Sequence, residues 1–132
     1  MSPEVLSLEN VQKRYGTSTP RRQFLFERFR MVVQLLRESG QVKHIYLFGS
    51  FLTTTPMPDD VDLFVVMAKG FTTVGLREPV AAIFAHDMCR IRYNIDVFWV
   101  TEAVGKEQVE AILDVFSRGR LRQPQGILGV RL

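Results

Sequence analysis

The chain has 132 residues, of which 46% are hydrophobic, and a formal net charge of +3. This length suits one globular domain with a buried core, and the mild positive charge suits an anionic ligand without requiring a nucleic acid. The single cysteine, Cys89, excludes an intrachain disulfide. The N-terminus does not read as a signal peptide, and no apolar run approaches the roughly 20 residues of a membrane span. We therefore expect a cytoplasmic protein with no membrane partner.

Two helices are predicted in the first forty residues. Ser7 can cap a short helix over 7–15. Thr19 can cap a longer one, with Pro20 at its first position and Gly40 as its stop. The longer helix carries one apolar stripe at the spacing of a core-facing surface, made of Leu25, Phe29, Val32 and Leu36.

The arginines of the longer helix lie mostly off that stripe. Arg21 and Arg22 stand at its start, where positive charge is unfavourable to the helix dipole. This placement indicates, weakly, an acidic partner.

The remainder, 43–132, predicts a sheet core that contains the catalytic strands. Strands are expected over 43–49, 60–67, 94–100 and, as an edge strand, 126–132. Helices are expected over 78–88 and 102–117, the second ending at Gly119 before a basic turn over 120–125. The chain is therefore predicted to be a single α+β domain, 1–132, with a small mixed sheet flanked by helices and with N-terminal helices over 1–40.

One motif points to chemistry. Gly49-Ser50 ends a hydrophobic strand, and Asp60-Val61-Asp62 opens the next one. Side chains two apart on a strand share a face, so the two carboxylates repel each other unless a cation lies between them. A divalent cation with oxygen ligands, such as Mg²⁺, resolves the repulsion. A Gly-Ser turn beside such an ion suggests a phosphate-bearing substrate.

Asp96 is a third carboxylate, in a strand that is otherwise apolar. A buried carboxylate is costly unless it is paired, hydrogen-bonded or bound to metal. If its strand lies beside the Asp60/Asp62 strand, the three side chains converge. The alternative is a strand-edge carboxylate paired with Arg90 or Arg92.

The other motif residues also have structural alternatives. Asp60 and Asp62 fit a solvated loop-to-strand junction, Ser50 fits a cap, and Gly49 fits an ordinary turn. His44, His86 and Cys89 lack metal-ligand spacing, and Cys89 is expected to be buried. Phe98 and Trp99 are expected in the core, with a stacking platform for a base as the alternative.

These residues carry a family resemblance. Gly49-Ser50, Asp60-x-Asp62 and the later Asp96 resemble the nucleotidyltransferase superfamily of DNA polymerase beta, in particular its minimal prokaryotic members. The specific motif covers 44–67 and 94–100. The stretch around Arg22, the segments 48–51 and 58–62, and Gly126-Ile127 also resemble a less characterised prokaryotic family of that superfamily. The resemblance implies a nucleotidyltransferase-like fold and transfer of a nucleoside monophosphate from an NTP, with pyrophosphate leaving.

The resemblance also implies roles for single residues. Asp60 and Asp62 would hold two Mg²⁺ ions, with Mn²⁺ as the alternative metal. Asp96 would complete the coordination of the ion that activates the attacking hydroxyl, and would accept the proton of that hydroxyl. Ser50 would bind the β or γ phosphate, and Gly49 would let the backbone approach it.

Lys69 follows the second strand and is a further candidate contact for the triphosphate. ATP is the favoured NTP. The segment 51–55 lacks the small or basic residues that many superfamily members have after Gly-Ser. No extra helical domain follows Asp96, so the acceptor is expected to be small, held by a second copy in a homodimer, or a partner protein or RNA.

Two other functions remain open. The chain could be a catalytically inactive protein of the same fold that binds a nucleotide or a partner. It could also be an interaction protein, such as one half of a toxin–antitoxin pair, since minimal superfamily members resemble that type.

Overall fold

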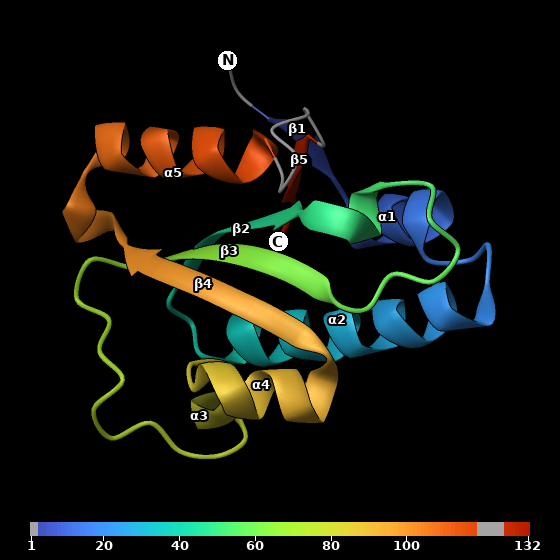
Figure 1. Ribbon diagram of the computed structural model, residues 1–132. Helices are drawn as coiled ribbons and strands as arrows, with labels where there is room; N and C mark the ends of the chain where they lie inside the picture. Colours follow the sequence, from blue (N-terminus) through green and yellow to red (C-terminus); the bar gives the residue numbers. More distant parts are fainter. Residues whose placement is uncertain (1–2, 119–125) are drawn as a thin grey trace.

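The computed structural model describes residues 3–118 and 126–132, and has the α+β fold that the sequence predicts (Figure 1). In this part of the chain five strands form one mixed sheet in the order β1-β5-β2-β3-β4. The pairs β1–β5 and β3–β4 are parallel, whereas β2 runs antiparallel to β3 and β5. The strands are β1 (Glu4–Leu6), β2 (Val42–Phe48), β3 (Val61–Met67), β4 (Ile95–Thr101) and β5 (Ile127–Val130).

The helices of the described residues are α1 (Leu8–Tyr15), α2 (Pro20–Glu38), α3 (Val80–Ile83), α4 (His86–Tyr93) and α5 (Lys106–Arg118), with 3₁₀ turns η1 (Gly49–Leu52) and η2 (Glu102–Val104). Both predicted N-terminal caps are confirmed. Ser7 Oγ accepts from the backbone N–H of Asn10 at 3.1 Å, and Thr19 Oγ1 accepts from that of Arg22 at 3.1 Å. None of these helices combines the length and apolar character that crossing a membrane requires.

One face of the sheet packs against α2 and α4, which lie together below it in Figure 1. The predicted stripe of α2 is confirmed, because each of its four residues is 0% exposed. Alternate strand residues such as Ile45, Leu63 and Val97 meet this stripe in one large apolar cluster. This face is the main hydrophobic core.

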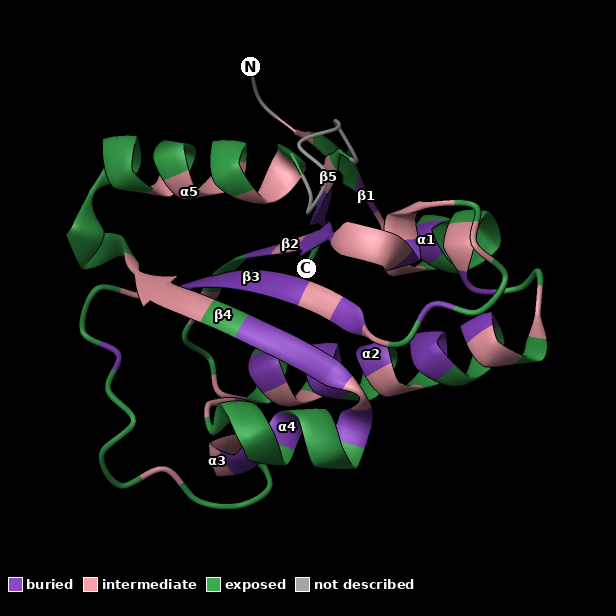
Figure 2. Cartoon of the chain, viewed as in Figure 1, coloured by how far each residue is buried: buried purple, intermediate pink, exposed green. Residues whose placement is uncertain are grey.

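The other face packs against α5 alone in the described structure. Phe48, Phe64 and Val66 are buried there, and the inward side chains of α5, including Phe116, are only half-buried. Figure 2 shows the contrast: the strands are mostly buried, whereas α5 is exposed along its outer side. The second face is therefore covered in part.

Two strand predictions are wrong. β1 was not expected, because three residues are too short to carry a period of two. β1 pairs with β5, which also pairs with β2, so β5 is an interior strand rather than the expected edge. β4 takes the opposite edge, and Phe98, expected in the core, is exposed there.

The helix predicted over 78–88 is also wrong as a single element. Ala85 is extended (ψ 100°) and separates α3 from α4. The break lets Ile83 and Cys89 both be buried, although residues six apart on one continuous helix point to different sides.

The helix predicted over 102–117 is likewise divided. Gly105, at φ 92°, separates η2 from α5 and leaves Val104 exposed. Val109 and Phe116 of α5 pack inward against the buried residues of the second face. The expected helix end at Gly119 and the basic turn over 120–125 lie outside the described residues.

Candidate metal centre

Three carboxylates, one on β3, one on β4 and one immediately before β3, meet on the face that α5 covers in part. Asp62 and Asp96 are direct partners in the parallel register of β3 and β4. Asp60 precedes Asp62 by two residues and lies immediately before β3. One ligand oxygen from each residue lies within 4.8 Å of the others. The sequence expectation that the three side chains converge if the strands are neighbours is met by this geometry.

The Asp96 carboxylate is the most buried of the three. It is 8% exposed, and its Oδ1 has no hydrogen-bond partner among the described residues. The nearest basic side chains are Arg90, with Nε at 3.6 Å, and His86, with Nε2 at 3.7 Å, both too far for a hydrogen bond. Arg90 Nη2 also lies 3.9 Å from Asp60 Oδ2. A buried oxygen without a close donor has an unmet demand for a positive partner.

The pKa of Asp60 also indicates that its ionised form is destabilised at this site. Burial, followed by the neighbouring Asp96 carboxylate, raises the pKa of Asp60 from 3.8 to about 6, against the opposing effect of Arg90. The attraction of Arg90 is thus too small to offset the effects of burial and of Asp96 on the Asp60 carboxyl. An added cation would stabilise the ionised form.

Gly49 lies directly against the cluster. It has φ 80°, and a Cβ at this position would overlap Asp62 Oδ2. Only glycine meets both demands without strain. Ser50 follows, half-buried, in η1, and its carbonyl accepts from the backbone N–H (3.0 Å) and the hydroxyl (2.7 Å) of Thr53.

The loop between Gly49-Ser50 and Asp60 is fastened by a buried arginine at the start of α2. Arg22 is 3% exposed. Its guanidinium donates to the carbonyls of Thr53 (2.6 Å), Phe51 (2.8 Å), Thr55 (3.0 Å) and Tyr15 (3.0 Å). Four acceptors satisfy the charge that burial would otherwise penalise.

Two neighbours of Arg22 extend the fastening. Arg21 donates to the carbonyls of Pro58 (3.0 Å) and Asp59 (2.5 Å), and Thr19 Oγ1 donates to that of Pro56 (2.8 Å). Arg22 is thus an exception to the expectation that the arginines of this helix lie mostly off its buried stripe. The two arginines that oppose the dipole at the start of α2 were the sequence signal for this clamp, and in the structure they contact main-chain carbonyls.

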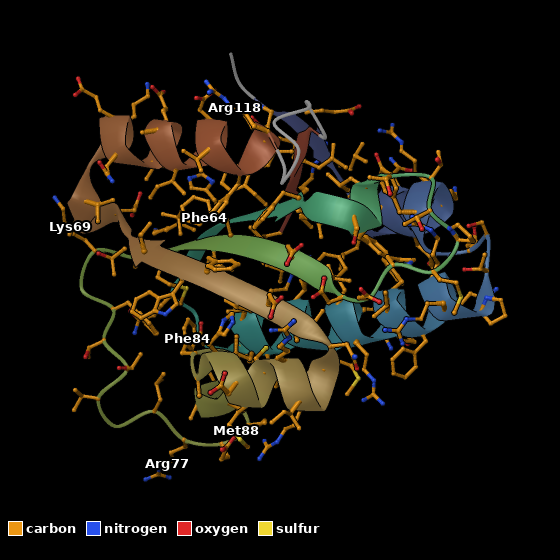
Figure 3. All side chains as sticks on the ribbon, in the orientation of Figure 1. Phe64, Lys69, Arg77, Phe84, Met88 and Arg118 are labelled. Atoms are coloured by element: carbon orange, nitrogen blue, oxygen red, sulfur yellow. The ribbon has the colours of Figure 1, made fainter. Side chains whose placement is uncertain are left out.

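Lys69 is not brought to the carboxylates. It follows the far end of β3, and Figure 3 places it at the side of the sheet where β3 ends, away from the Asp60 end. Arg90 is the pairing alternative named for Asp96, whereas Arg92 pairs with Glu78 Oε2 at 3.2 Å.

Sequence reasoning missed His86, which has no metal-ligand spacing along the chain and reaches Asp96 only through the packing of α4 beside β4. The expectation for Cys89 is confirmed. It is buried, and burial raises the pKa of its thiol to about 12, so the thiol stays protonated.

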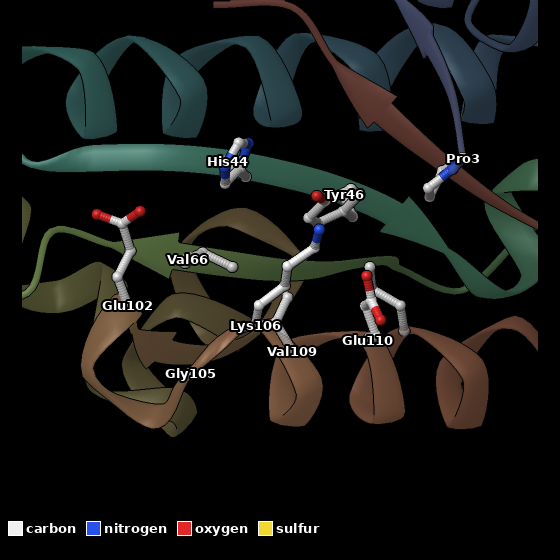
Figure 4. Close-up of a pocket in the computed structure, with 10 residues that line it drawn as sticks. Pro3, His44, Tyr46, Val66, Glu102, Gly105, Lys106, Val109 and Glu110 are labelled. Atoms are coloured by element: carbon white, nitrogen blue, oxygen red, sulfur yellow. The ribbon is translucent and has the colours of Figure 1, made fainter. Parts of the chain in front are cut away.

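A cleft of about 450 Å³ lies elsewhere on the same face, between β2 and α5 (Figure 4). Its lining includes His44, Tyr46 and Lys106, and none of the three carboxylates is among the described residues that line it. The carboxylate cluster, not this cleft, brings together three carboxylate oxygens that could hold a metal ion.

A family model described as a family of unknown function, DUF6932, matches residues 4–131, so the chain belongs to this family. No curated protein matches the chain. A solved structure of the tri-AMPylated Shewanella oneidensis HEPN toxin in complex with the MNT antitoxin is similar at 19% identity and a TM-score of 0.35. The match covers 64% of this chain and 61% of that one, so the chain spans about three fifths of its length. A likeness at this level carries no argument about activity.

Proposed function

We propose that this member of the DUF6932 family is a Mg²⁺-dependent nucleotidyltransferase that moves a nucleoside monophosphate from a nucleoside triphosphate, foremost ATP, to a hydroxyl acceptor. The observation that carries the proposal is the meeting of three carboxylates within 4.8 Å beside Gly49-Ser50. Asp60, Asp62 and Asp96 are the residues of the resemblance described above, and the fold brings them together. Phosphoryl transfer depends on positioning and charge neutralisation, which such a cluster supplies.

The cluster fits a hard divalent cation on three counts. All three donors are carboxylate oxygens, the ligands that Mg²⁺ and Mn²⁺ prefer. Asp96 Oδ1 is buried with no hydrogen-bond partner in the described part of the chain. Burial and the neighbouring Asp96 carboxylate raise the pKa of Asp60 to about 6, and a bound cation would oppose both effects. Asp60, Asp62 and Asp96 would therefore hold the metal, proposed as two Mg²⁺ ions.

The proposed reaction forms a bond between the acceptor oxygen and the α-phosphorus. The bond from that phosphorus to the oxygen bridging to the β-phosphate breaks, and pyrophosphate leaves with the electron pair. Bound Mg²⁺ would neutralise the triphosphate and lower the pKa of the attacking hydroxyl. Asp96 accepts the hydroxyl proton in this scheme, and Ser50 donates a hydrogen bond to a phosphate oxygen.

The clamp at the start of α2 supports the proposal. Gly49-Ser50 and Asp60 are the two ends of one loop, and the hydrogen bonds of Arg21 and Arg22 hold the main chain between them. A loop fixed in this way keeps the phosphate-binding and metal-binding residues in register before the substrate arrives, which reduces the cost of ordering them during the reaction.

The test is pyrophosphate release in the presence of Mg²⁺ and each of the four NTPs, with candidate hydroxyl acceptors followed by intact mass. We expect Asp60→Asn combined with Asp62→Asn to abolish release while the fold persists. Asp59→Asn is the matched control, because Asp59 is an exposed neighbour. Unchanged release in the double variant would refute the proposal.

A second candidate function is nucleotide binding without turnover, alone or with a partner protein. The contacts of Arg90 with Asp60 and Asp96 favour it, because a protein cation beside both carboxylates could take the place of a metal ion. Calorimetry with Mg·ATP separates the candidates. Binding without release of pyrophosphate, across all acceptors tested, would support this second function.

A further inference from the structure

Phe98 is an exposed aromatic side chain beside the three carboxylates. It follows Asp96 by two residues on β4 and therefore faces the same side of the sheet. Its side chain is 40% exposed, and Figure 2 shows the exposed band in the middle of an otherwise buried or half-buried strand. Other apolar side chains of the chain are exposed too, so the position of Phe98, rather than its exposure, carries the argument.

The ring of Phe98 is supported by other rings before any ligand binds. Its centroid lies 5.3 Å from that of Phe116, 5.6 Å from that of His86 and 6.0 Å from that of Phe48. These neighbours come from α5, α4 and β2, so three elements fix its orientation. A ring held in place loses little conformational entropy when a flat partner covers its open side.

We propose that Phe98 is the platform on which the base of the nucleoside triphosphate stacks while the phosphates lie at Asp60, Asp62 and Asp96. This inference rests on the proposed function and adds a base-binding subsite to it. Residues two apart on a strand are separated by about 6–7 Å, roughly the span of the ribose that joins a base to its α-phosphate. The carboxylates and the ring are therefore spaced as the two ends of a nucleoside monophosphate are.

The chemistry of the platform defines a substrate class. Stacking contacts the face of a base, which every base has, and does not distinguish hydrogen-bonding edges. The larger rings of purines cover more of the Phe98 surface than pyrimidines do. The subsite therefore selects purine over pyrimidine triphosphates and separates ATP from GTP only weakly.

The test is calorimetric titration with ATP, CTP and inorganic tripolyphosphate, each with Mg²⁺ and without acceptor. Tripolyphosphate carries the phosphate chain without a base. We expect Phe98→Leu to weaken ATP binding about tenfold and to leave tripolyphosphate binding unchanged, which also reports an intact carboxylate site. Phe98→Trp, which keeps a ring, should retain ATP affinity. Phe24→Ala, which removes an equally exposed ring from α2, should change neither affinity.

The outcomes separate the two proposals. Equal affinity of the wild-type protein for ATP and tripolyphosphate would overturn the platform and leave the metal and phosphate site standing. An equal loss of both ligands in Phe98→Leu would overturn it as well, because Phe98 would then act on the site as a whole. If the wild-type protein bound no phosphate ligand with Mg²⁺, the proposed function would fail and the platform with it.

Discussion

The two faces of the sheet are built from the same alternating strands and differ in what covers them. On the α2 side, β3 places Leu63 and Val65 in a continuous apolar core. On the α5 side, the same strand places Asp62 and then Phe64, and α5 covers the face only in part. The apolar core on the α2 side therefore supplies burial that stabilises the fold, whereas the α5 side holds crowded carboxylates, which oppose folding unless their charge is neutralised.

The largest expected loss of stability comes from a substitution in the hydrophobic core on the α2 side. Phe29→Ala should lower the free energy of unfolding by about 3–5 kcal/mol, because a fully buried ring leaves a cavity. Urea unfolding measures the change. Phe24→Ala on the same helix is the control, and as an exposed ring it should cost less than about 1 kcal/mol. Similar losses of stability in the two variants would contradict the assignment of the main hydrophobic core to the α2 side of the sheet.

The second largest expected effect concerns Arg22, whose hydrogen bonds hold the loop that precedes Asp60. Arg22→Met should cost about 2–4 kcal/mol, because it leaves buried carbonyls of the loop without a donor. It should also weaken Mg²⁺ binding, since this loop ends at Asp60. Arg37→Met, at an exposed position of α2, should lie within about 0.5 kcal/mol of the wild-type protein. A stable Arg22→Met protein with unchanged Mg²⁺ affinity would show that the clamp does not position the site.

Gly49→Ala tests the close approach of the Gly49 backbone to the Asp62 carboxylate on the α5 side. It should cost about 2–3 kcal/mol, because the methyl group adds an overlap with Asp62 to the strain of a positive φ. Gly40→Ala is matched, since Gly40 also has positive φ (69°) but a Cβ there meets no heavy atom of the described residues within 4 Å. It should cost only about 1 kcal/mol. Equal thermal shifts would mean that Asp62 moves aside freely.

The smallest expected effect is a gain in stability, which we expect for Asp60→Asn in the absence of metal. The pKa of Asp60 is raised from 3.8 to about 6, so the folded state binds the proton more tightly than the unfolded state. Without metal, this group favours folding most below pH 4, and its contribution falls as the pH rises through about 6. Asp60→Asn should remove that fall and leave the metal-free protein about 1–2 kcal/mol more stable at pH 7.

Thermal unfolding in a chelator across pH 4–8 measures this change, with Asp59→Asn as the control. Added Mg²⁺ should stabilise the wild-type protein at pH 7 and not the Asp60→Asn variant. A destabilised Asp60→Asn protein at pH 7 without metal would contradict the assignment of strain to the cluster.

Local patterns determined much of this protein. The caps at Ser7 and Thr19, the α2 stripe and the strands that carry Asp62 and Asp96 follow from residue chemistry and spacing, which act within one element. Those patterns also selected the three carboxylates and Gly49, because acidic residues beside or within apolar strands are conspicuous in any sequence.

The remaining features depend on which elements become neighbours in the folded chain, and local patterns do not encode this. The parallel register of β3 and β4 sets Asp62 opposite Asp96, the packing of α4 brings His86 and Arg90 to them, and β1 turns β5 into an interior strand. The direction of β3 separates Lys69 from the carboxylates. Burial of Arg22 requires a loop more than thirty residues further along the chain, a contact that no local period encodes.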